Sequence, residues 1–280
     1  MTSTAASPTT SPGAGRLRWL LADSLTLTGR NLAHVRQVPE KLIDVTLQPL
    51  MFVLLFAFVF GGVIEVPGGG DYHEYLIGGI LVQTLAFGMM GPGVSMATDL
   101  GEGILDRFRS LPMTRPAFLL GHLTAEFMAS ILAVAIMVVS GFVVGWRIHS
   151  DPAEALGGFA LIALLSITML WLGTLIGVIA RTPDVVQGIA FLVIFPLTFV
   201  ASTFVPVAGL PAGLRGFAEF NPVSSWAAAV RTLFGNPTAT PSDASWPLQH
   251  PVLASVLWCA AILAVVVPLT LRAYRRRTSG

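Results

Sequence analysis

Charged side chains gather in one short stretch of an otherwise apolar sequence, LGEGILDRFRSLPMTR, which runs from Leu100 to Arg115. Charged residues make up only 11% of the 280 residues. Acidic and basic side chains are mixed in this stretch, whereas simple topological anchors need only Lys and Arg. A mixed-charge surface suits a specific protein partner, because complementary charges fix the register of docking. The spacing leaves two interpretations open, a docking helix and a solvated connecting loop.

The same stretch predicts an amphipathic helix over residues 101–112. Apolar side chains at positions 104, 105, 108 and 111 share one helical face, and charged side chains take the other positions. Pro112 ends the helix, and Pro116 suits the first turn of the next one. We expect the apolar face to rest on neighbouring helices and the charged face to meet water.

Motifs for other kinds of chemistry do not occur in the sequence. It contains no GxxxxGK[ST] phosphate loop and no GxSxG nucleophile motif. HEYLI begins at His73 like a zinc-protease helix, but Ile77 stands where the second His is required. Cys259 is the only cysteine, so neither a disulfide nor a thiolate metal cluster is expected. We therefore expect no catalytic residue, no metal site and no cofactor bound by this chain, so any ATP-driven step would need an ATPase on another polypeptide.

One ionisable pair, His122 and Glu126, lies near the start of a long apolar run. Ionisable residues inside membrane spans are functional candidates by default. The run is nearly thirty residues long, or about 45 Å as a helix, whereas a bilayer core is about 30 Å thick. Because the charge-free part begins after Glu126, we expect this carboxylate at the membrane edge, paired with His122, in preference to a proton relay.

The composition predicts an all-α polytopic membrane protein. Hydrophobic residues make up 54% of the chain, and charged residues are far below the roughly 25% of an ordinary soluble domain. Several apolar runs are long enough to cross a bilayer as helices, and the alternation of a β-barrel is missing. Six transmembrane helices are expected, over residues 45–64, 75–98, 118–146, 155–180, 185–206 and 252–271.

Basic residues orient these spans. Most of the 16 Lys and Arg residues lie before the first span, after the second and fourth spans, or after the last one. Arg147, Arg215 and Arg231 alone fall in the other loops. The positive-inside rule then places both termini in the cytosol. The expected location is a bacterial plasma membrane, and the charged stretch 101–112 faces the cytosol.

The segments outside the spans are also assigned. Residues 1–15 are expected to form a disordered cytosolic tail, and residues 273–280 a basic cytosolic tail. Residues 16–38 predict an interfacial amphipathic helix. Residues 209–234 are too polar to span, and Asn221-Pro222 divides them into two short helices at the outer leaflet, packed on the last two spans. Residues 16–272 thus form a single transmembrane permease domain.

Glycines inside the spans predict close packing and one loosened helix. The pairs Gly141–Gly145 and Gly173–Gly177 are GxxxG patterns, which we assign to packing within one chain. Gly88 and the following GPG at 91–93 are expected to loosen the second span.

Four segments resemble type-2 ATP-binding-cassette exporter membrane subunits, most closely the daunorubicin/doxorubicin-resistance subgroup. The segments are VPEKLIDVTLQPLMFVLLFAFVFGG, DLGEGILDRFRSLPMTRPAFLLG, RTPDVVQGIAFLVIFPLTFVASTFVP and FNPVSSWAAAVRTL. The resemblance runs in order from about residue 36 to the end of the chain. It implies a permease that pairs with a second, identical protomer and docks two copies of a separate ATPase subunit, which binds ATP and Mg.

The resemblance also assigns residues to the ATPase contact. The helix after the second span is the coupling element of that family. Carried over by motif position, the contact residues are Glu102, Gly103, Asp106, Arg107, Phe108 and Arg109.

The expected function is outward transport of an amphipathic or lipid-like compound, such as a drug, an antibiotic or a lipid. Residues assigned to the path are Phe52, Phe56, Phe195, Thr198, Phe199, Ser202 and Phe204. Expected partners also include membrane lipid, whereas no nucleic acid is expected. The alternative is a stand-alone proton-coupled secondary transporter. A membrane enzyme acting on lipid would need a cluster of catalytic polar groups, which the sequence does not show.

Overall fold

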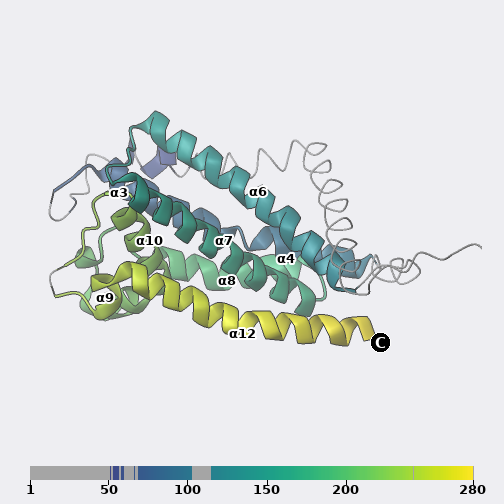
Figure 1. Ribbon diagram of the computed structural model, residues 1–280. Helices are drawn as coiled ribbons and strands as arrows, with labels where there is room; N and C mark the ends of the chain where they lie inside the picture. The colour runs from purple at the N-terminus through teal and green to yellow at the C-terminus, as the bar shows by residue number, and fades with distance from the viewer. Residues whose placement is uncertain are drawn as a thin grey trace, which may run out of the picture.

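A computed structural model describes residues 51, 53–56, 58–59, 66, 69–102, 115–241 and 243–279 (Figure 1). Regular structure in these residues is helical, without a strand, which confirms the predicted all-α class. The helices are α3 (Tyr72–Phe87), α4 (Met90–Gly101), α6 (Arg115–Val144), α7 (Pro152–Ile179), α8 (Pro183–Phe199), the 3-10 turn η1 (Val207–Gly209), α9 (Ala212–Phe220), α10 (Pro222–Leu233), α11 (Trp246–Gln249) and α12 (Pro251–Ser279). The predicted tail 1–15 and the interfacial helix 16–38 lie outside the described residues.

Four helical segments in the described part of the chain are long and apolar enough to cross a bilayer. They are Tyr72–Gly101, Phe118–Val144, Pro152–Ile179 and Pro251–Arg277. They coincide with the predicted second, third, fourth and last spans. Most of the predicted first span lies outside the described residues, although residues 51, 53–56 and 58–59 are helical.

The predicted fifth span, residues 185–206, is shorter than expected. Helix α8 begins at Pro183 and ends at Phe199 after 17 residues, about 26 Å at 1.5 Å per residue. Residues 200–205 turn away from the helix axis, and the predicted boundary at 206 is therefore wrong. Residues 201–204 of the turn are buried, so they are as apolar as a membrane helix, and the sequence gives no sign that the helix has ended.

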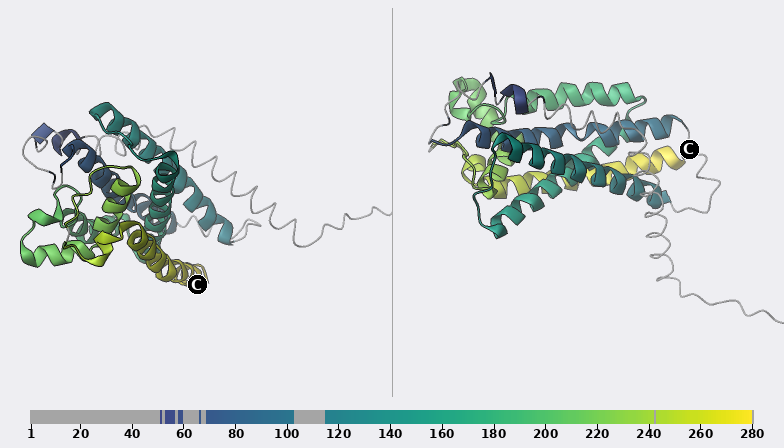
Figure 2. Two further views of the ribbon diagram at one scale, coloured as in Figure 1. Left: turned by 60° about the vertical axis from the view of Figure 1, so that its left-hand side comes forward. Right: turned by 90° about the horizontal axis from the view of Figure 1, so that it is seen from above.

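Central and peripheral helices differ sharply in burial. In Tyr72–Gly101, 67% of the most apolar 18-residue stretch is buried inside the protein. The same share is 11% in Phe118–Val144 and 22% in Pro251–Arg277. Figure 1 shows α6 and α12 on opposite sides of the other labelled helices, and Figure 2 shows the bundle in two further orientations. These two helices expose apolar side chains that are suited to contact lipid. Inside a bilayer such side chains meet no water, so they need not be buried within the protein.

Helices α4 and α7 cross closely because glycine leaves no side chain between them. A Cβ at Gly173 would strike the carbonyl oxygen of Met89, and one at Gly177 would strike that of Gly93. This confirms the predicted packing of the Gly173–Gly177 pair within one chain. In the other pair, a Cβ at Gly141 would lie 3.1 Å from Cγ2 of Ile77 on α3, so this glycine packs within the chain as predicted. Gly145 has a φ of 110° and meets nothing within 4 Å, so it only follows the end of α6.

The predicted loosening of the second span appears as a break between α3 and α4. Helix α3 ends at Phe87, Gly88 is its C-cap, and α4 begins at Met90. The proline that follows, Pro92, lies in the first turn of α4, where the missing N–H does little harm. The two helices still form one continuous apolar segment.

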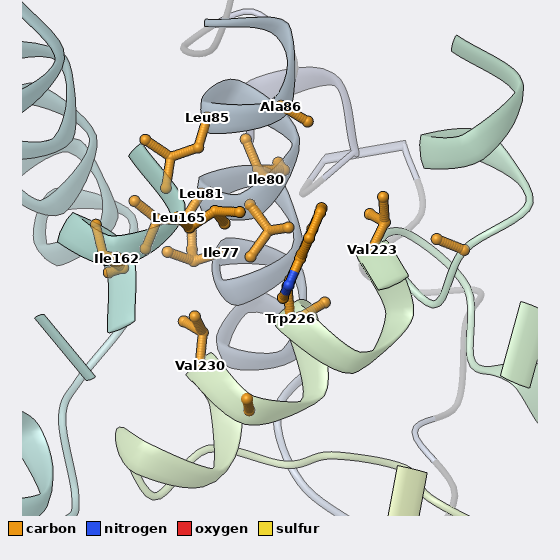
Figure 3. Packing of buried hydrophobic residues seen from close by; sticks show 14 of the residues in the cluster. Ile77, Ile80, Leu81, Leu85, Ala86, Ile162, Leu165, Val223, Trp226 and Val230 are labelled. Atoms are coloured by element: carbon orange, nitrogen blue, oxygen red, sulfur yellow. The ribbon is translucent and has the colours of Figure 1, made fainter. Parts of the chain in front are cut away.

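The main core lies where α3, α7 and α10 meet (Figure 3). Helix α3 contributes Ile77 and Leu81, and α7 contributes Leu165. From α10, Trp226 and Val230 point into the same cluster. Close packing of these side chains holds the helices together, because van der Waals contacts drive helix association where lipid is as apolar as the core. The short helix α10 is therefore an integral part of the core at its end of the bundle.

The division of residues 209–234 at Asn221-Pro222 is confirmed. Asn221 ends α9, and its side chain caps α10 by accepting a hydrogen bond from the N–H of Val223 at 2.9 Å. The expected packing partners differ in part, because α10 lies mainly against α12 and α3 and only slightly against α8. The cause is a pair of glycines on α3 that admits a side chain of α10.

Candidate functional site

The predicted ATPase contact begins at the end of α4. Glu102 is the C-cap of this helix, its N–H donates to the carbonyl oxygen of Thr98 at 2.9 Å, and its side chain is exposed. It lies at the end of the bundle that also holds the start of α6 and the C terminus (Figure 1). The other predicted contact residues lie outside the described residues: Gly103, Asp106, Arg107, Phe108 and Arg109. The coupling helix 101–112 therefore stays a prediction.

Four phenylalanines of the predicted path form a continuous stack. The rings of Phe56 and Phe204 lie 4.1 Å apart between centroids, those of Phe204 and Phe199 5.3 Å, and those of Phe199 and Phe195 4.2 Å. Phe204 is buried, whereas Phe195 and Phe199 are 45% and 40% exposed. Phe52, the remaining predicted aromatic residue of the path, lies outside the described residues. The stack thus joins α8 to the helical residues near position 56. Its α8 end, formed by Phe195 and Phe199, is exposed, whereas Phe204 is buried.

The two polar residues predicted for the path face the protein interior. Thr198 is fully buried, and its hydroxyl donates to the carbonyl oxygen of Ile194 at 2.9 Å. Ser202 is 3% exposed, and its N–H donates to the hydroxyl oxygen of Ser224 at 3.0 Å. The Thr198 hydroxyl thus bonds within α8, and the Ser202 hydroxyl lies 3.5 Å from the carbonyl oxygen of Ser224 on α10.

Side chains from α3 and α10 hold the turn after α8, residues 200–205, by its carbonyl groups. The hydroxyl of Tyr75 donates to Ser202 at 2.8 Å, and the hydroxyl of Tyr72 donates to Phe204 at 3.0 Å. Arg231 donates to Thr203 through Nη2 at 3.0 Å. A buried carbonyl without a partner is costly, and these bonds remove that cost. Asn221 does the same for α8 itself, since its Nδ2 donates to Leu197 at 2.7 Å.

Arg231 is the most unusual residue at this end of the bundle. Its side chain is fully buried, and the described part of the chain places no carboxylate within ion-pair distance of it. Its Nε donates to the carbonyl oxygen of Tyr75 at 2.7 Å, and its guanidinium carbon lies 3.5 Å from the centroid of the Tyr75 ring. Carbonyl dipoles and an aromatic face replace the missing anion. Burial lowers the pKa of this guanidinium below its usual range.

Glycines on α3 make room for this arginine and for the turn. A Cβ at Gly78 would lie 2.8 Å from Cγ of Arg231, and one at Gly79 would strike the carbonyl oxygen of Thr203. The sequence interpretation counted Arg231 only as a loop charge and assigned no role to Tyr72 or Tyr75. The adjacent glycines within an apolar helix were the available signal, because they mark a close approach.

A second polar cluster fixes α9. Arg215 pairs with Glu219 at 2.8 Å and with Asp243 at 2.7 Å, and Glu219 also accepts the N–H of Ser245 at 2.9 Å. Burial alone raises the pKa of Glu219, but the bonds from Arg215 and Ser245 outweigh it and leave the pKa below its usual range. Hydrogen bonding to Arg215 likewise lowers the pKa of Asp243. This cluster ties the loop before α11 to α9.

His122 and Glu126, near the start of α6, both face the start of α4. The Nε2 atom of buried His122 lies 3.2 Å from the carbonyl oxygen of Pro92. A Cβ at Gly91 would lie 3.3 Å from the carboxylate of Glu126, so this side chain faces the start of α4. In the described residues no group of three His, Cys, Asp or Glu side chains could hold a metal ion.

The sequence matches the family described as ABC-2 type transporter over residues 24–234. It is 30% identical, over 96% of each chain, to the daunorubicin resistance ABC transporter permease protein DrrB1 of Streptomyces coeruleorubidus. It is 27% identical to the doxorubicin resistance ABC transporter permease protein DrrB of Mycobacterium tuberculosis, over 69% of this chain and 66% of the relative. These matches confirm the resemblance inferred from the motifs. The matched range includes Glu102, the aromatic stack and Arg231.

Proposed function

The chain belongs to the ABC-2 type transporter family, and from this premise we propose that it is the permease subunit of an ATP-driven exporter in a bacterial plasma membrane. Both termini would face the cytosol, as the distribution of basic residues indicates. The observation that carries the proposal is the family match over residues 24–234, which contains both the charged stretch and the aromatic stack. Helices of spanning length on either side of that stretch support it.

Energy for transport is proposed to come from a separate ATPase that docks on residues 101–112. The support is that this segment follows Tyr72–Gly101 and precedes Phe118–Val144 in the sequence, two helices of spanning length whose adjoining ends lie at the end of the bundle with the C terminus. A push on this segment would reach α4 directly. Because Gly173 and Gly177 bring α7 against the backbone of α4, α4 and α7 would move as one body.

The cargo is proposed to be amphipathic or lipid-like and to pass along the aromatic stack between two copies of the chain. Phe195 and Phe199 expose large apolar surfaces on α8, next to the similarly exposed Phe191 and Leu192. A wall of aromatic and aliphatic side chains suits such a molecule better than an ion or a sugar. The names of the two relatives, daunorubicin and doxorubicin resistance proteins, make doxorubicin a reasonable first probe.

Charge reversal at Glu102 tests the ATPase contact. The chain is co-expressed with its candidate ATPase subunit, and complexes are purified through a tag on the chain. We expect Glu102→Arg to reduce the recovered ATPase at least severalfold and to slow ATP-dependent uptake of doxorubicin into inside-out vesicles. Glu154→Arg is the matched control, since Glu154 is equally exposed but lies in the first turn of α7.

Two results would contradict the proposal. Unchanged ATPase recovery and uptake in the Glu102→Arg variant would exclude a contact at this residue. Uptake by the purified chain alone, driven by an imposed pH gradient with no ATPase present, would identify a proton-coupled secondary transporter instead.

The path is tested with alanine at the exposed end of the stack. Phe195→Ala and Phe199→Ala remove exposed aromatic surface, so they should cost little stability yet reduce the stimulation of ATPase activity by doxorubicin. Phe217→Ala is the control, because Phe217 is 54% exposed but lies on α9. Unchanged stimulation in both path variants would remove these residues from the path.

A further inference from the structure

Helix α12 changes its chemical character near its C-terminal end. Up to Leu271 its exposed side chains are apolar, and Val265 and Leu269 are 59% and 44% exposed. The following residues include a group of arginines: Arg272, Arg275, Arg276 and Arg277. The helix continues without interruption through this change, to Ser279.

One face of this helical end is anchored to the bundle. Val266, Thr270 and Tyr274 follow each other at intervals of four residues and are buried. Arg277 extends the same face, and its Nη2 donates to the carbonyl oxygen of Ala180 at 3.1 Å. These contacts with the end of α7 fix the rotation of α12 about its axis.

The fixed rotation turns two arginines away from the bundle. Val265, Leu269, Arg272 and Arg276 are spaced i, i+4, i+7 and i+11, so they lie on one helical face. All four are exposed. No ion pair to Arg272 or Arg276 occurs in the part of the chain that the structure describes. The apolar face that is suited to lipid therefore continues directly into two guanidinium groups.

The length of the helix sets the depth of these groups in a bilayer. The apolar part from Pro251 to Leu271 is about 30 Å long at 1.5 Å per residue, which equals the thickness of the hydrocarbon core. Arg272 and Arg276 then extend about 2–8 Å beyond it, where the phosphates of the headgroups lie. Arginine suits this position, because its planar fork binds two phosphate oxygens at once.

We propose that Arg272 and Arg276 form a binding site for an anionic phospholipid in the leaflet at the C-terminal end of the bundle. Its acyl chains lie along Val265 and Leu269, and its phosphate binds the two guanidinium groups. Charge complementarity and continuity with the lipid-facing surface of α12 select a lipid over a protein partner. The site does not depend on the source of energy for transport or on its direction.

Native mass spectrometry of the full-length chain in detergent tests the site. The chain is titrated separately with phosphatidylglycerol and with phosphatidylcholine of the same acyl chains, and bound states are counted. We expect phosphatidylglycerol to bind on the order of tenfold more tightly, from two arginines at the membrane surface. Substitution of both by glutamine, Arg272→Gln with Arg276→Gln, is expected to abolish the difference.

Two matched variants separate charge from folding. The double substitution Arg272→Lys with Arg276→Lys keeps the charge and should keep most of the preference. Arg147→Gln changes an exposed arginine at the opposite end of the bundle, whose Nη1 donates to the carbonyl oxygens of Phe142 and Trp146, and should leave the preference intact.

Equal binding of the two lipids by the unchanged chain would overturn the proposal. So would an undiminished preference in the double glutamine variant. If that variant kept the preference but lost the ATPase in co-purification, the arginines would belong to a protein interface instead. A lost preference with normal ATPase recovery is the result that supports the site.

Discussion

Two arginine sites at opposite ends of the bundle use the same side chain in opposite ways. Arg231 is fully buried among α3, α10 and the turn after α8, and its partners are two carbonyl groups and an aromatic ring. Arg272 is exposed on the face of α12 that points away from the bundle, and no ion pair to it occurs among the described residues. The first arginine holds backbone segments together, whereas the second is available to another molecule. Burial and partners, and not residue type, decide which role an arginine has.

The largest effect is expected from loss of the buried arginine. Arg231→Leu leaves the carbonyl oxygen of Thr203 without its donor in a buried place and removes the second donor of the Tyr75 carbonyl, which should cost up to about 3 kcal/mol. The thermal unfolding midpoint of the purified chain in detergent measures this loss. Arg272→Gln is the control and should change stability by less than about 0.5 kcal/mol. Equal midpoints for the two variants would remove the contrast between the sites.

A methyl group between α3 and the turn should also be strongly destabilising. In Gly79→Ala the new Cβ would strike the carbonyl oxygen of Thr203, and Nη2 of Arg231 would lie 2.8 Å away. Overpacking of this kind costs about 1–3 kcal/mol. Gly188→Ala serves as the control, because nothing lies within 4 Å of that position on α8, and it should leave stability unchanged or raise it. A tolerated Gly79→Ala would mean that the turn approaches α3 less closely.

Removal of the Tyr75 hydroxyl should destabilise the buried arginine site by a smaller amount. Tyr75→Phe keeps the ring beneath Arg231 but loses the bond to the carbonyl oxygen of Ser202. We expect a loss of about 1–2 kcal/mol in the same unfolding measurement. Combined with Arg231→Leu, the two losses should not add, since both act on neighbouring carbonyls of one turn. Strict additivity would show that the two side chains stabilise separate parts of the structure.

The smallest effect is expected from acid at the cluster that fixes α9. The pKa values of Glu219 and Asp243 are lowered in the folded chain, so their contribution to stability is present at neutral pH. It is lost as the pH falls below 4.5, the ordinary pKa of a glutamate. The unfolding midpoint should therefore fall less steeply with acid in Arg215→Gln than in the unchanged chain. Parallel curves for the two proteins would show that the cluster adds no stability.

Much of the helical arrangement is predictable from local patterns. Apolar runs predicted the four segments of spanning length, because a helix is the structure that satisfies its backbone within lipid. Asn221-Pro222 predicted the division between α9 and α10 through ordinary capping chemistry. The GxxxG pair at Gly173 and Gly177 predicted a close crossing. These features depend on residues within one or two turns of each other.

The misplaced end of the fifth span has a cause that local sequence does not show. The end of α8 at Phe199 was placed too late because the turn after it is as apolar as a span, and its carbonyls are satisfied by residues distant in sequence. Thr198 and Ser202 were assigned to the path from their polarity. In this structure the Thr198 hydroxyl donates to the carbonyl oxygen of Ile194, and the Ser202 hydroxyl lies 3.5 Å from the carbonyl oxygen of Ser224 on α10. Their role in transport stays a prediction.

The amino-acid sequence by itself determined the class of the molecule, since long apolar runs can be accommodated only as membrane helices, and its charged stretch and motifs indicated the family. The tertiary structure alone decided which polar residues are buried together. Contacts such as that between Arg231 and Tyr75 join residues 156 positions apart, and no local pattern encodes such a distance. They exist because two glycines on α3 leave a space that one long side chain of α10 fills.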